Sequence, residues 1–527
     1  MYIGILKNIQ PRRYQQEIFE NCKEKNCLVV LPTGVGKTLI ALMLSVYTKN
    51  KNPSSKILFL APTRPLAQQH LEYFKKNLQE NFAKLNLFTG KINPEKRKKL
   101  FEESDIIFST PQCISNDIKS GLYDLKEVSL LIEDECHRCL KNYAYTYIAK
   151  EYKEKAKNAK ILGLTASPGT SKEIIKQIAN NLGIETIEIR TRESEDVKEY
   201  LQELKFEIIK LDFPKELSEI KELLKDIYDK KIEELKNRKL LFQLPTKKNL
   251  LELQKKIINL ISTGNRNFNV LAAASACAQA IKLQYCIELL ETQTLYALQK
   301  YIQELFHQAN KNKSRAVKQL VKQPKFNQAY IKITELISKN FENPKIEKIK
   351  EIVKREIEEN KNKRILVFSN YRDSIIKICK TLNEIENINA RVFVGQAKKG
   401  ETGLTQKEQQ EIIKDFSEGK INILVSSSIG EEGLDIPEVG AVIFYEPIPS
   451  AIRKIQRAGR TARLSKGKLI ILMNKKTIDE SYYWAAFHKE KRMYKALNAL
   501  KEELQKKDSL SNADFKQNPK EKQKTLF

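Results

Sequence analysis

The sequence predicts an α/β protein with two doubly wound parallel-sheet domains and an all-helical domain inserted between them. Three observations lead to this fold class. Short apolar runs alternate with longer helical patterns over residues 1–205, and the same alternation returns over 346–497. Between them, residues 206–345 have almost no glycine and keep the spacing of helices. The last segment, 498–527, is polar and is expected to end in a disordered tail.

Six apolar runs are candidate strands of the first domain. They are continuous rather than alternating, which is typical of strands buried on both faces of a parallel sheet. Longer segments with helical patterns separate them, as crossover connections require. The candidate strands are Cys27–Leu31, Ile57–Ala61, Asp105–Ser109, Leu130–Asp134, Ile161–Thr165 and Ile184–Ile189.

The inserted domain is predicted to be helical and basic. Its apolar residues recur three or four positions apart, as in Leu295, Leu298, Ile302 and Leu305. Over 201–350 there are 28 Lys and Arg against 17 Asp and Glu. A solvated helix face and a phosphate-binding face both fit such an excess, so both interpretations stay open. The excess is concentrated in Lys311, Lys313, Arg315, Lys318, Lys322 and Lys325.

The second α/β domain repeats the pattern of the first. Its candidate strands are again short apolar runs separated by helical patterns, and no repeat of 20–50 residues relates the two halves. The candidate strands are Arg364–Ser369, Arg391–Gly395, Asn422–Ser427, Ala441–Tyr445 and Lys468–Met473.

Composition favours a basic protein of the cytosol. The chain of 527 residues carries 94 Lys and Arg against 66 Asp and Glu, a net charge of +28. This excess excludes an acidic solvating protein and makes a polyanion the first partner to consider, although a Lys-rich proteome gives the same balance. No apolar run is long enough for a membrane span, and the N-terminus lacks the pattern of a secretion signal. We therefore expect no membrane partner.

The eight cysteines are scattered, which suits reduced thiols and not a disulfide framework. Cys136 and Cys139 form a single CxxC pair. Without a second pair, and with only four His in the chain, a zinc site is not expected.

A phosphate-binding turn follows the first candidate strand. Pro32-Thr33-Gly34-Val35-Gly36-Lys37-Thr38 lies between Cys27–Leu31 and a helical run. A glycine-containing turn at a helix N-terminus lets backbone N–H groups surround phosphate oxygens. Lys37 would reach the β- and γ-phosphates, and the Thr38 hydroxyl would bind Mg²⁺. The pattern predicts ATP and Mg²⁺ as cofactors.

Two carboxylates end the fourth candidate strand. Asp134 and Glu135 directly follow an apolar run, where a carboxylate beside a phosphate loop holds Mg²⁺. Asp134 takes that role in our interpretation, and Glu135 is placed to orient or deprotonate the attacking water. An isolated Asp-Glu pair is usually solvated charge, but its position after this strand favours the functional interpretation.

The run Asp134-Glu135-Cys136-His137 resembles the DEAH-type motif of superfamily 2 helicases, and further motifs of that superfamily appear in order. The resemblance implies two RecA-like domains. It implies adenine recognition by Arg12 and Gln15, and coupling of ATP state to nucleic-acid state through motif III and its partners, His137, Thr165 and Ser167. The residues that it places against nucleic acid are Thr63, Arg64, Gly90, Thr110, Ser369, Asn370 and Ser427.

Two more segments resemble superfamily motifs in the second domain. In the motif V-like run, Gly433 would allow close backbone approach and Asp435 resembles the ribose or coupling carboxylate. The motif VI-like run contains Gln456, Arg460 and Arg463; the two arginines would reach the γ-phosphate as arginine fingers. Ala462 stands where the family usually has Gly. It costs of order 1 kcal/mol if φ there is positive, and fits better than Gly if the segment is helical.

Longer matches resemble the archaeal Hef and Fanconi-anaemia M family of branched-DNA helicases. They include Asn142-Tyr143-Ala144-Tyr145, Leu289-Leu290-Glu291-Thr292-Gln293, the run 444–453 and Glu480-Ser481-Tyr482-Tyr483-Trp484. The resemblance covers roughly residues 5–497. It implies an ATP-dependent motor that acts on replication forks and four-way junctions in repair and fork restart, with the insert gripping duplex DNA, in the cytoplasm and associated with the nucleoid.

Some expectations and alternatives accompany this resemblance. Cys136 stands where Hef relatives more often have Ala, and the Cys form is commoner in RNA motors of the Dicer and RIG-I type, which remain the alternative. A passive junction-binding scaffold is a third interpretation. The XPF-like nuclease motif of Hef proteins is not seen, so a separate nuclease subunit would have to cut DNA. The end Gln523-Lys524-Thr525-Leu526-Phe527 weakly resembles a sliding-clamp-binding peptide, and a bare disordered end is the favoured interpretation.

Overall fold

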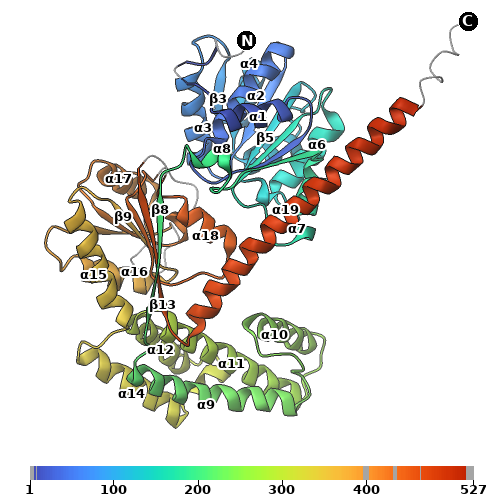
Figure 1. The fold of residues 1–527 in the computed structure, drawn as a ribbon. Helices are drawn as coiled ribbons and strands as arrows, with labels where there is room; N and C mark the ends of the chain where they lie inside the picture. The colour runs from blue at the N-terminus through green and yellow to red at the C-terminus, as the bar shows by residue number, and fades with distance from the viewer. Residues whose placement is uncertain (1–4, 8, 396–402, 431–435, 463–464, 518–527) are drawn as a thin grey trace, which may run out of the picture.

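Two parallel sheets and a helical bundle make up the chain, and one long helix connects them (Figure 1). The structure is a computed structural model. It describes residues 5–7, 9–395, 403–430, 436–462 and 465–517, with side chains to residue 506.

The first domain is built on a seven-stranded parallel sheet in the order β3-β4-β2-β5-β6-β1-β7. Helices lie between consecutive strands, as the alternating pattern predicts. The strands are β1 (Cys27–Val30), β2 (Lys56–Leu60), β3 (Leu85–Phe88), β4 (Ile106–Ser109), β5 (Val128–Asp134), β6 (Ile161–Thr165) and β7 (Thr186–Ile189). The helices are α1 (Arg13–Cys22), α2 (Lys37–Lys51), α3 (Arg64–Asn77), α4 (Pro94–Glu103), α5 (Pro111–Lys119), the 3₁₀ turn η2 (Cys136–Arg138), α6 (Ala144–Lys155), α7 (Lys172–Leu182) and α8 (Glu195–Lys198).

Each face of this sheet packs into its own apolar cluster. Successive residues of β1 enter opposite clusters, Leu28 and Val30 on one side and Cys27 and Val29 on the other. Burial on both faces explains why these strands read as continuous apolar runs. The edge strand β3 was not predicted, because three of its four residues are only partly buried and its apolar run is weaker.

The inserted domain is a helical bundle, as predicted, with α11 (Phe268–Thr292) at its centre (Figure 1). α11 is long and apolar enough to cross a membrane, but a buried helix at the centre of a bundle can have the same length and composition. The other helices are α9 (Lys215–Asn237), α10 (Lys247–Ser262), α12 (Leu295–Asn310), α13 (Arg315–Val321) and α14 (Pro324–Ser338).

The second domain has a six-stranded parallel sheet in the order β10-β11-β9-β12-β13-β8. Its strands are β8 (Leu204–Leu211), β9 (Ile365–Phe368), β10 (Ala390–Phe393), β11 (Ile423–Ser426), β12 (Ala441–Phe444) and β13 (Gly467–Asn474). Its helices are α15 (Pro344–Glu359), α16 (Arg372–Leu382), α17 (Gln406–Ser417), the 3₁₀ turn η3 (Ser428–Gly430) and α18 (Ala451–Ala458).

Strand β8 corrects a predicted boundary. Residues from 206 onward were expected in the helical insert, whereas Leu204–Leu211 pairs with β13 over eight residues as the edge of the second sheet. Lys and Glu side chains interrupt its apolar residues, as an edge strand tolerates. The second sheet is therefore completed by chain that precedes the insert.

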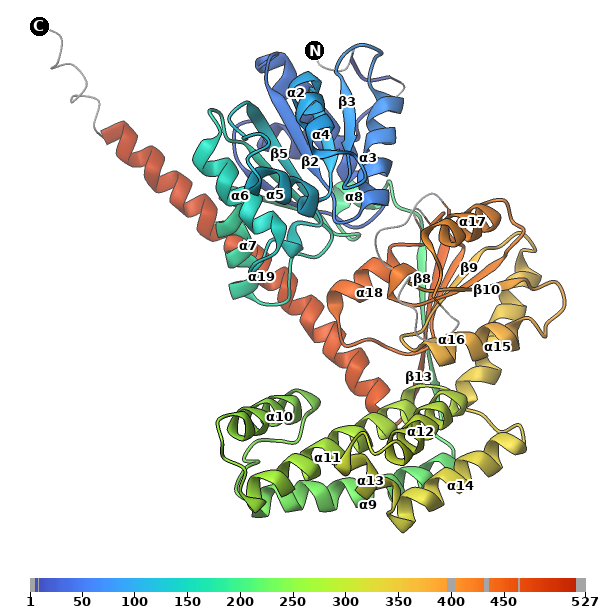
Figure 2. The same ribbon diagram turned by 180° about the vertical axis from the view of Figure 1, so that it is seen from behind.

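Helix α19 (Ile478–Gln517) corrects the predicted tail. It leaves the second domain after β13, passes α18 and reaches α7 and β7 of the first domain (Figure 2). Met493, Leu497 and Leu500 are buried in the core of the first domain. Residues 498–517 are helical and not a disordered tail. The buried apolar residues of this helix lie among many charged residues, so the sequence of the segment resembles a solvated tail.

Candidate nucleotide and nucleic-acid site

The phosphate-binding turn has the predicted strand–turn–helix setting. It connects β1 to α2, and Gly34 and Gly36 both have φ of +83°. A side chain on Gly36 would also place its Cβ 2.3 Å from Gln15 Nε2. The Lys37 ammonium donates to the carbonyls of Leu31 (3.1 Å) and Pro32 (3.3 Å), across the mouth of the turn. The turn thus presents its backbone at the N-terminus of α2, where anions bind.

The predicted adenine-recognition element packs against this turn. The Tyr14 hydroxyl donates to the Val35 carbonyl at 2.6 Å, and Gln15 Nε2 donates to the same carbonyl at 3.2 Å. The Gln15 side-chain oxygen accepts the backbone N–H of Arg12. The Arg12 guanidinium lies 4.8 Å from the centre of the Tyr200 ring. Arg12 and Gln15 therefore lie beside the turn.

Thr38 and Asp134 are linked by His70, a residue without a predicted role. Asp134 Oδ2 lies 2.9 Å from His70 Nε2, and Thr38 Oγ1 lies 3.5 Å from His70 Nδ1. A hydroxyl and a carboxylate are the hard oxygen ligands that Mg²⁺ prefers, so the donor set fits that ion. A single His on a helix gives no sequence signal of such a position.

Glu135 is held as a carboxylate. It sits in the left-handed region with φ of +51°, and its Oε2 lies 3.2 Å from His137 Nδ1. Burial raises the pKa of Glu135, but the hydrogen bond and charge of His137, together with Lys37, outweigh burial and hold that pKa at about 2. At neutral pH the group is ionised and can orient a water molecule by accepting its hydrogen bond, whereas so low a pKa makes it a weak base.

The predicted coupling residues are also brought together. His137 Nδ1 lies 3.2 Å from Thr165 Oγ1, and Thr165 Oγ1 accepts the backbone N–H of Ser167 at 3.1 Å. Thr165 also lies 3.5 Å from Glu135 Oε2. Thr165 and Ser167 are fully buried where β6 ends. One hydrogen-bonded chain thus joins the carboxylate to the end of a neighbouring strand.

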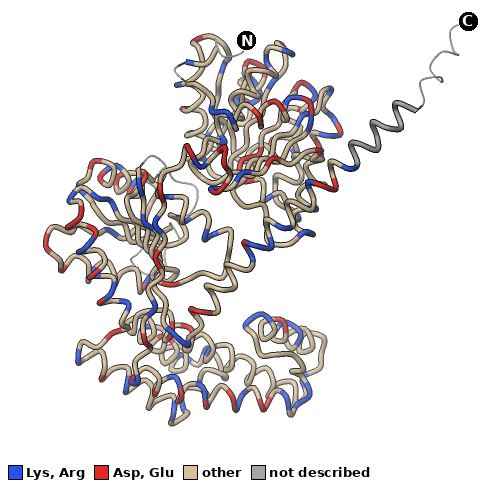
Figure 3. The backbone as a smooth tube through the Cα atoms, viewed as in Figure 1, with Lys and Arg blue, Asp and Glu red and all other residues tan. Residues whose placement is uncertain are grey.

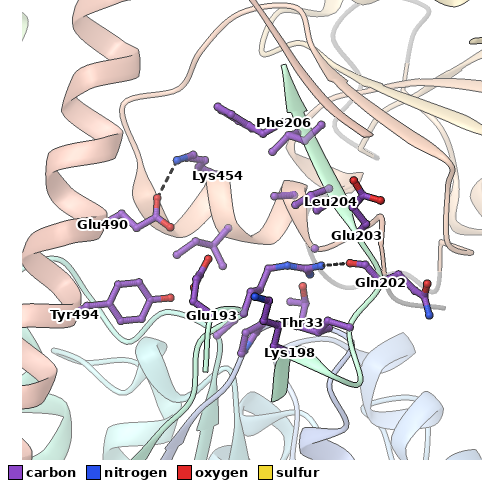
Figure 4. Close-up of a pocket in the computed structure, with 18 residues that line it drawn as sticks. Thr33, Glu193, Lys198, Gln202, Glu203, Leu204, Phe206, Lys454, Glu490 and Tyr494 are labelled. Carbon is purple, nitrogen blue, oxygen red and sulfur yellow. Dashed lines mark hydrogen bonds and ion pairs between the residues drawn. The ribbon is translucent and has the colours of Figure 1, made fainter. Parts of the chain in front are cut away.

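The second domain meets the phosphate-binding turn through α18. A Cβ added to Gly459 would lie 1.4 Å from Thr33 Oγ1, so the backbone of one domain touches the turn of the other. A cavity of about 710 Å³ opens beside this contact, with Thr33 on one wall and Lys454 of α18 on another (Figure 4). Lys454 pairs with Glu490 of α19 at 2.9 Å. The two domains therefore touch at the turn, and the cavity lies beside this contact.

The motif VI-like residues lie on and just after α18. Gln456 is buried on the helix, which ends at Ala458, so Arg460 follows the helix. Ala462 has φ of +56°, which settles that its position is not helical and that glycine would be less strained there. Arg463 lies outside the described residues, as do Gly433 and Asp435 of the motif V-like run.

The predicted nucleic-acid contacts follow strand ends. Thr63, Gly90 and Thr110 come after β2, β3 and β4, which are neighbours at one side of the first sheet. Carboxyl ends of parallel strands meet at one edge, so these residues share a surface, on which Arg64 begins α3. Asn370 and Ser427 follow the neighbouring strands β9 and β11 in the same way.

Ser369 is placed differently from its neighbour Asn370. It is fully buried, and its hydroxyl donates to Gln293 of the insert at 3.1 Å. Asn370 is exposed, and its side-chain oxygen accepts from Arg457 at 2.8 Å and from Arg453 at 3.2 Å. Ser369 thus joins the second domain to the insert, while Asn370 faces outward.

A buried charged network underlies Asn370. Glu446 accepts the Asn370 backbone N–H at 2.6 Å, and the fully buried Arg457 guanidinium lies 4.7 Å from the Phe368 ring centre. Neither Glu446 nor Arg457 had a predicted role. Both residues lie in runs that resemble family motifs, but only the folded structure shows that both hydrogen-bond to Asn370.

Charged residues occur along the backbone of all three domains, and Lys and Arg recur along the insert (Figure 3). The CxxC cysteines are buried, and in the described part of the chain no group of three or more His, Cys, Asp or Glu could hold a metal ion.

Three protein-family profiles match consecutive parts of the chain. Residues 8–170 match "Type III restriction enzyme, res subunit", and residues 344–465 match "Helicase conserved C-terminal domain". Residues 216–340 match "Putative ATP-dependent RNA helicase, helical bundle". The three matches follow the first domain, the insert and the second domain in order.

Related proteins match nearly the whole chain. The solved helicase domain of Hef from Pyrococcus furiosus is 42% identical, with a TM-score of 0.70, and the match covers 92% of this chain and 100% of that domain. "Putative ATP-dependent RNA helicase MJ1505" of Methanocaldococcus jannaschii is 39% identical, over 94% of this chain and 61% of its own length. "ATP-dependent DNA helicase fml1" of Schizosaccharomyces pombe is 32% identical, over 89% of this chain and 57% of its own length. The chain thus spans about three fifths of these two curated relatives.

Proposed function

The chain belongs to the Hef helicase family of superfamily 2, and from this premise we propose that it is an ATP-driven motor that moves on branched DNA. One observation carries the proposal. Gly459, at the end of α18, touches Thr33 in the phosphate-binding turn of the other domain. A nucleotide bound at this turn lies at the junction of two domains, so binding and hydrolysis can close and open the cleft between them.

ATP hydrolysis is assigned to residues of both domains. The turn and Lys37 would hold the phosphates, and Glu135 would orient the attacking water or accept its proton. Thr38 and Asp134 would hold Mg²⁺, which when bound neutralises phosphate charge. Arg460 would approach the γ-phosphate from the second domain.

DNA is proposed as the track. Thr63, Arg64, Gly90 and Thr110 would contact one strand from the first domain, and Asn370 and Ser427 from the second. Contacts to phosphate and sugar carry no sequence information, so stepping would not depend on sequence. The Schizosaccharomyces pombe relative, whose name is that of a DNA helicase, supports this choice. The RNA-helicase name of the Methanocaldococcus relative keeps RNA as the second candidate.

The insert would grip duplex DNA near the branch. Its excess of Lys and Arg supports a phosphate-binding face. We place the protein in the cytoplasm, associated with the nucleoid. A separate nuclease subunit and a sliding clamp bound by 523–527 remain proposals, and that peptide lies outside the described residues. A clamp pulldown that is unchanged by removal of the last five residues would contradict the clamp proposal.

ATPase and unwinding assays test the motor directly. Forked DNA, a four-way junction, plain DNA duplex and RNA duplex are compared with ATP and with a non-hydrolysable analogue. We expect the branched DNAs to stimulate ATP hydrolysis most, and Lys37→Ala to abolish the stimulated rate. Stronger stimulation by RNA would favour the RNA motor. Equal inactivity of wild type and Lys37→Ala on every substrate would favour a passive scaffold.

A further inference from the structure

His70 is buried in the first domain, on the helix whose first turn carries candidate DNA contacts. It lies on α3, six residues after Arg64, and is 8% exposed. Its ring lies 4.4 Å from that of Phe59 on β2. Phe59 in turn packs against Phe74 of the same helix and Phe108 of β4. Aromatic packing therefore fixes where the imidazole points.

The imidazole connects two oxygens that the site assigns to the same cation. Its Nε2 lies 2.9 Å from Asp134 Oδ2, and its Nδ1 lies 3.5 Å from Thr38 Oγ1, which is the outer limit of a hydrogen bond. A proton on Nε2 and none on Nδ1 satisfies both contacts, with Nε2–H donating to the carboxylate and the Thr38 hydroxyl donating to Nδ1. This leaves Asp134 Oδ1 and the lone pairs of Thr38 Oγ1 available to a cation.

A histidine in a protein core needs polar partners, and any carbonyl or hydroxyl would serve. His70 instead contacts Thr38 and Asp134, the two side chains that would hold the cation. It does so from α3, whereas Thr38 lies in α2 and Asp134 ends β5. Groups that orient metal ligands in this way raise metal affinity by ~10–100-fold. The arrangement also joins α3 to the nucleotide site, because a shift of this helix displaces the imidazole from both ligands.

We propose that His70 is a positioning residue that orients Thr38 and Asp134 for the divalent cation and couples them to DNA held at the start of α3. The proposal rests on the proposed motor function. DNA contact at Thr63 and Arg64 would fix the position of α3. The fixed helix holds the imidazole against Asp134, and the ordered ligands increase the rate of ATP hydrolysis.

Two substitutions separate orientation from packing. His70→Leu fills the space without a hydrogen bond, and His70→Gln keeps an N–H donor close to the position of Nε2. Gln68→Ala is the control, because Gln68 is exposed on the same helix. Mn²⁺ binding in the presence of ADP is measured by electron paramagnetic resonance, which needs no turnover. ATP hydrolysis is then measured with and without forked DNA at saturating Mg²⁺.

We expect His70→Leu to weaken Mn²⁺ binding about 10-fold or more and to reduce the DNA stimulation of ATP hydrolysis, with His70→Gln restoring most of both. Wild-type Mn²⁺ affinity in His70→Leu, or a His70→Gln no better than His70→Leu, would overturn the positioning role. Full DNA stimulation in His70→Leu would overturn the coupling. Absence of DNA stimulation in wild type would contradict the motor function instead, and the Mn²⁺ measurement would still test the positioning role.

Discussion

Glu446 is a buried carboxyl that holds the backbone of an exposed residue in place. It accepts the backbone N–H of Asn370, one of the candidate DNA contacts, and is almost completely buried. Burial raises the pKa of Glu446 to about 7, although the charges of Arg457 and Lys345 oppose the rise. The carboxyl therefore changes its charge near neutral pH, directly beneath Asn370.

The raised pKa predicts a pH-dependent stability. The usual pKa of this group is 4.5, so between pH 4.5 and 7 the folded protein holds a proton that the unfolded chain releases. The contribution of Glu446 to the free energy of unfolding should therefore fall as the pH rises through this window, by about 3 kcal/mol, and stay level above it. Urea unfolding of the full chain at a series of pH values measures the slope.

Glu446→Gln is the matched variant, because its amide oxygen can still accept the Asn370 N–H. The slope should become shallower without vanishing, since burial also raises the pKa of Asp479 to about 6 and raises the pKa values of Glu133 and Glu342. An unchanged slope in Glu446→Gln would show that Glu446 does not titrate there.

At the residue scale the sequence predicted what local chemistry determines. The turn could be predicted because a strand, a turn and a helix adjacent in sequence form it, and Asp134 and Glu135 stood out because they directly follow an apolar strand. The roles given to these residues stay predictions. His70 and Glu446 could not be singled out in this way, because their partners are 64 and 76 residues away, at Asp134 and Asn370, and meet them only in the folded chain. The sequence allowed two backbone conformations at Ala462, helical or with a positive φ. The φ of +56° shows that the strained conformation is the one adopted.

At the scale of elements, α19 links the two α/β domains. Met493 and Leu497 are fully buried in the first domain, whereas the helix begins after β13 of the second. The helix was missed beyond residue 497 because its charged composition resembles a solvated tail, and β8 was missed because an edge strand lacks a continuous apolar run. Both elements owe their structure to distant partners.

Leu497→Ala should detach α19 from the first domain. The loss of a fully buried leucine costs about 2–4 kcal/mol, and here that cost falls on the contact between helix and domain. The single tryptophan of the chain, Trp484, lies half-exposed on α19 and reports its environment by fluorescence. In Leu497→Ala we expect the unfolding transition followed by Trp484 fluorescence to have its midpoint at a lower urea concentration than in wild type. Asn498→Ala, exposed on the adjacent position, should leave the transition unchanged, and equal shifts in the two variants would contradict the docking.

At the scale of the whole molecule, residues of both α/β domains make up the proposed ATP site, and neither domain contains all of them. The turn and carboxylates belong to the first domain, and the arginine that would approach the phosphate belongs to the second. The domains touch where Gly459 faces Thr33, while the cavity beside them is about 710 Å³. Close approach of the two domains at this contact would bring the arginine of the second domain to the phosphates held by the first. A change at the contact should therefore lower the rate of ATP hydrolysis more than it weakens nucleotide binding.

Gly459→Ala tests this separation. The added Cβ would lie 2.6 Å from Thr33 Cβ and closer to its hydroxyl, so the domains would have to move apart. We expect the DNA-stimulated kcat to fall by about 10-fold or more, because each ~1.4 kcal/mol lost from the closed state is a factor of ten. The affinity for a fluorescent ADP analogue should change little, since the nucleotide-binding turn and α1 lie in the first domain. Gly419→Ala in the second domain is the control, because its Cβ would meet nothing within 4 Å; its φ of +81° makes alanine more strained there than at Gly459, where φ is −69°. A Gly459→Ala enzyme that hydrolyses ATP as fast as Gly419→Ala would mean that the contact with Thr33 has no part in closure.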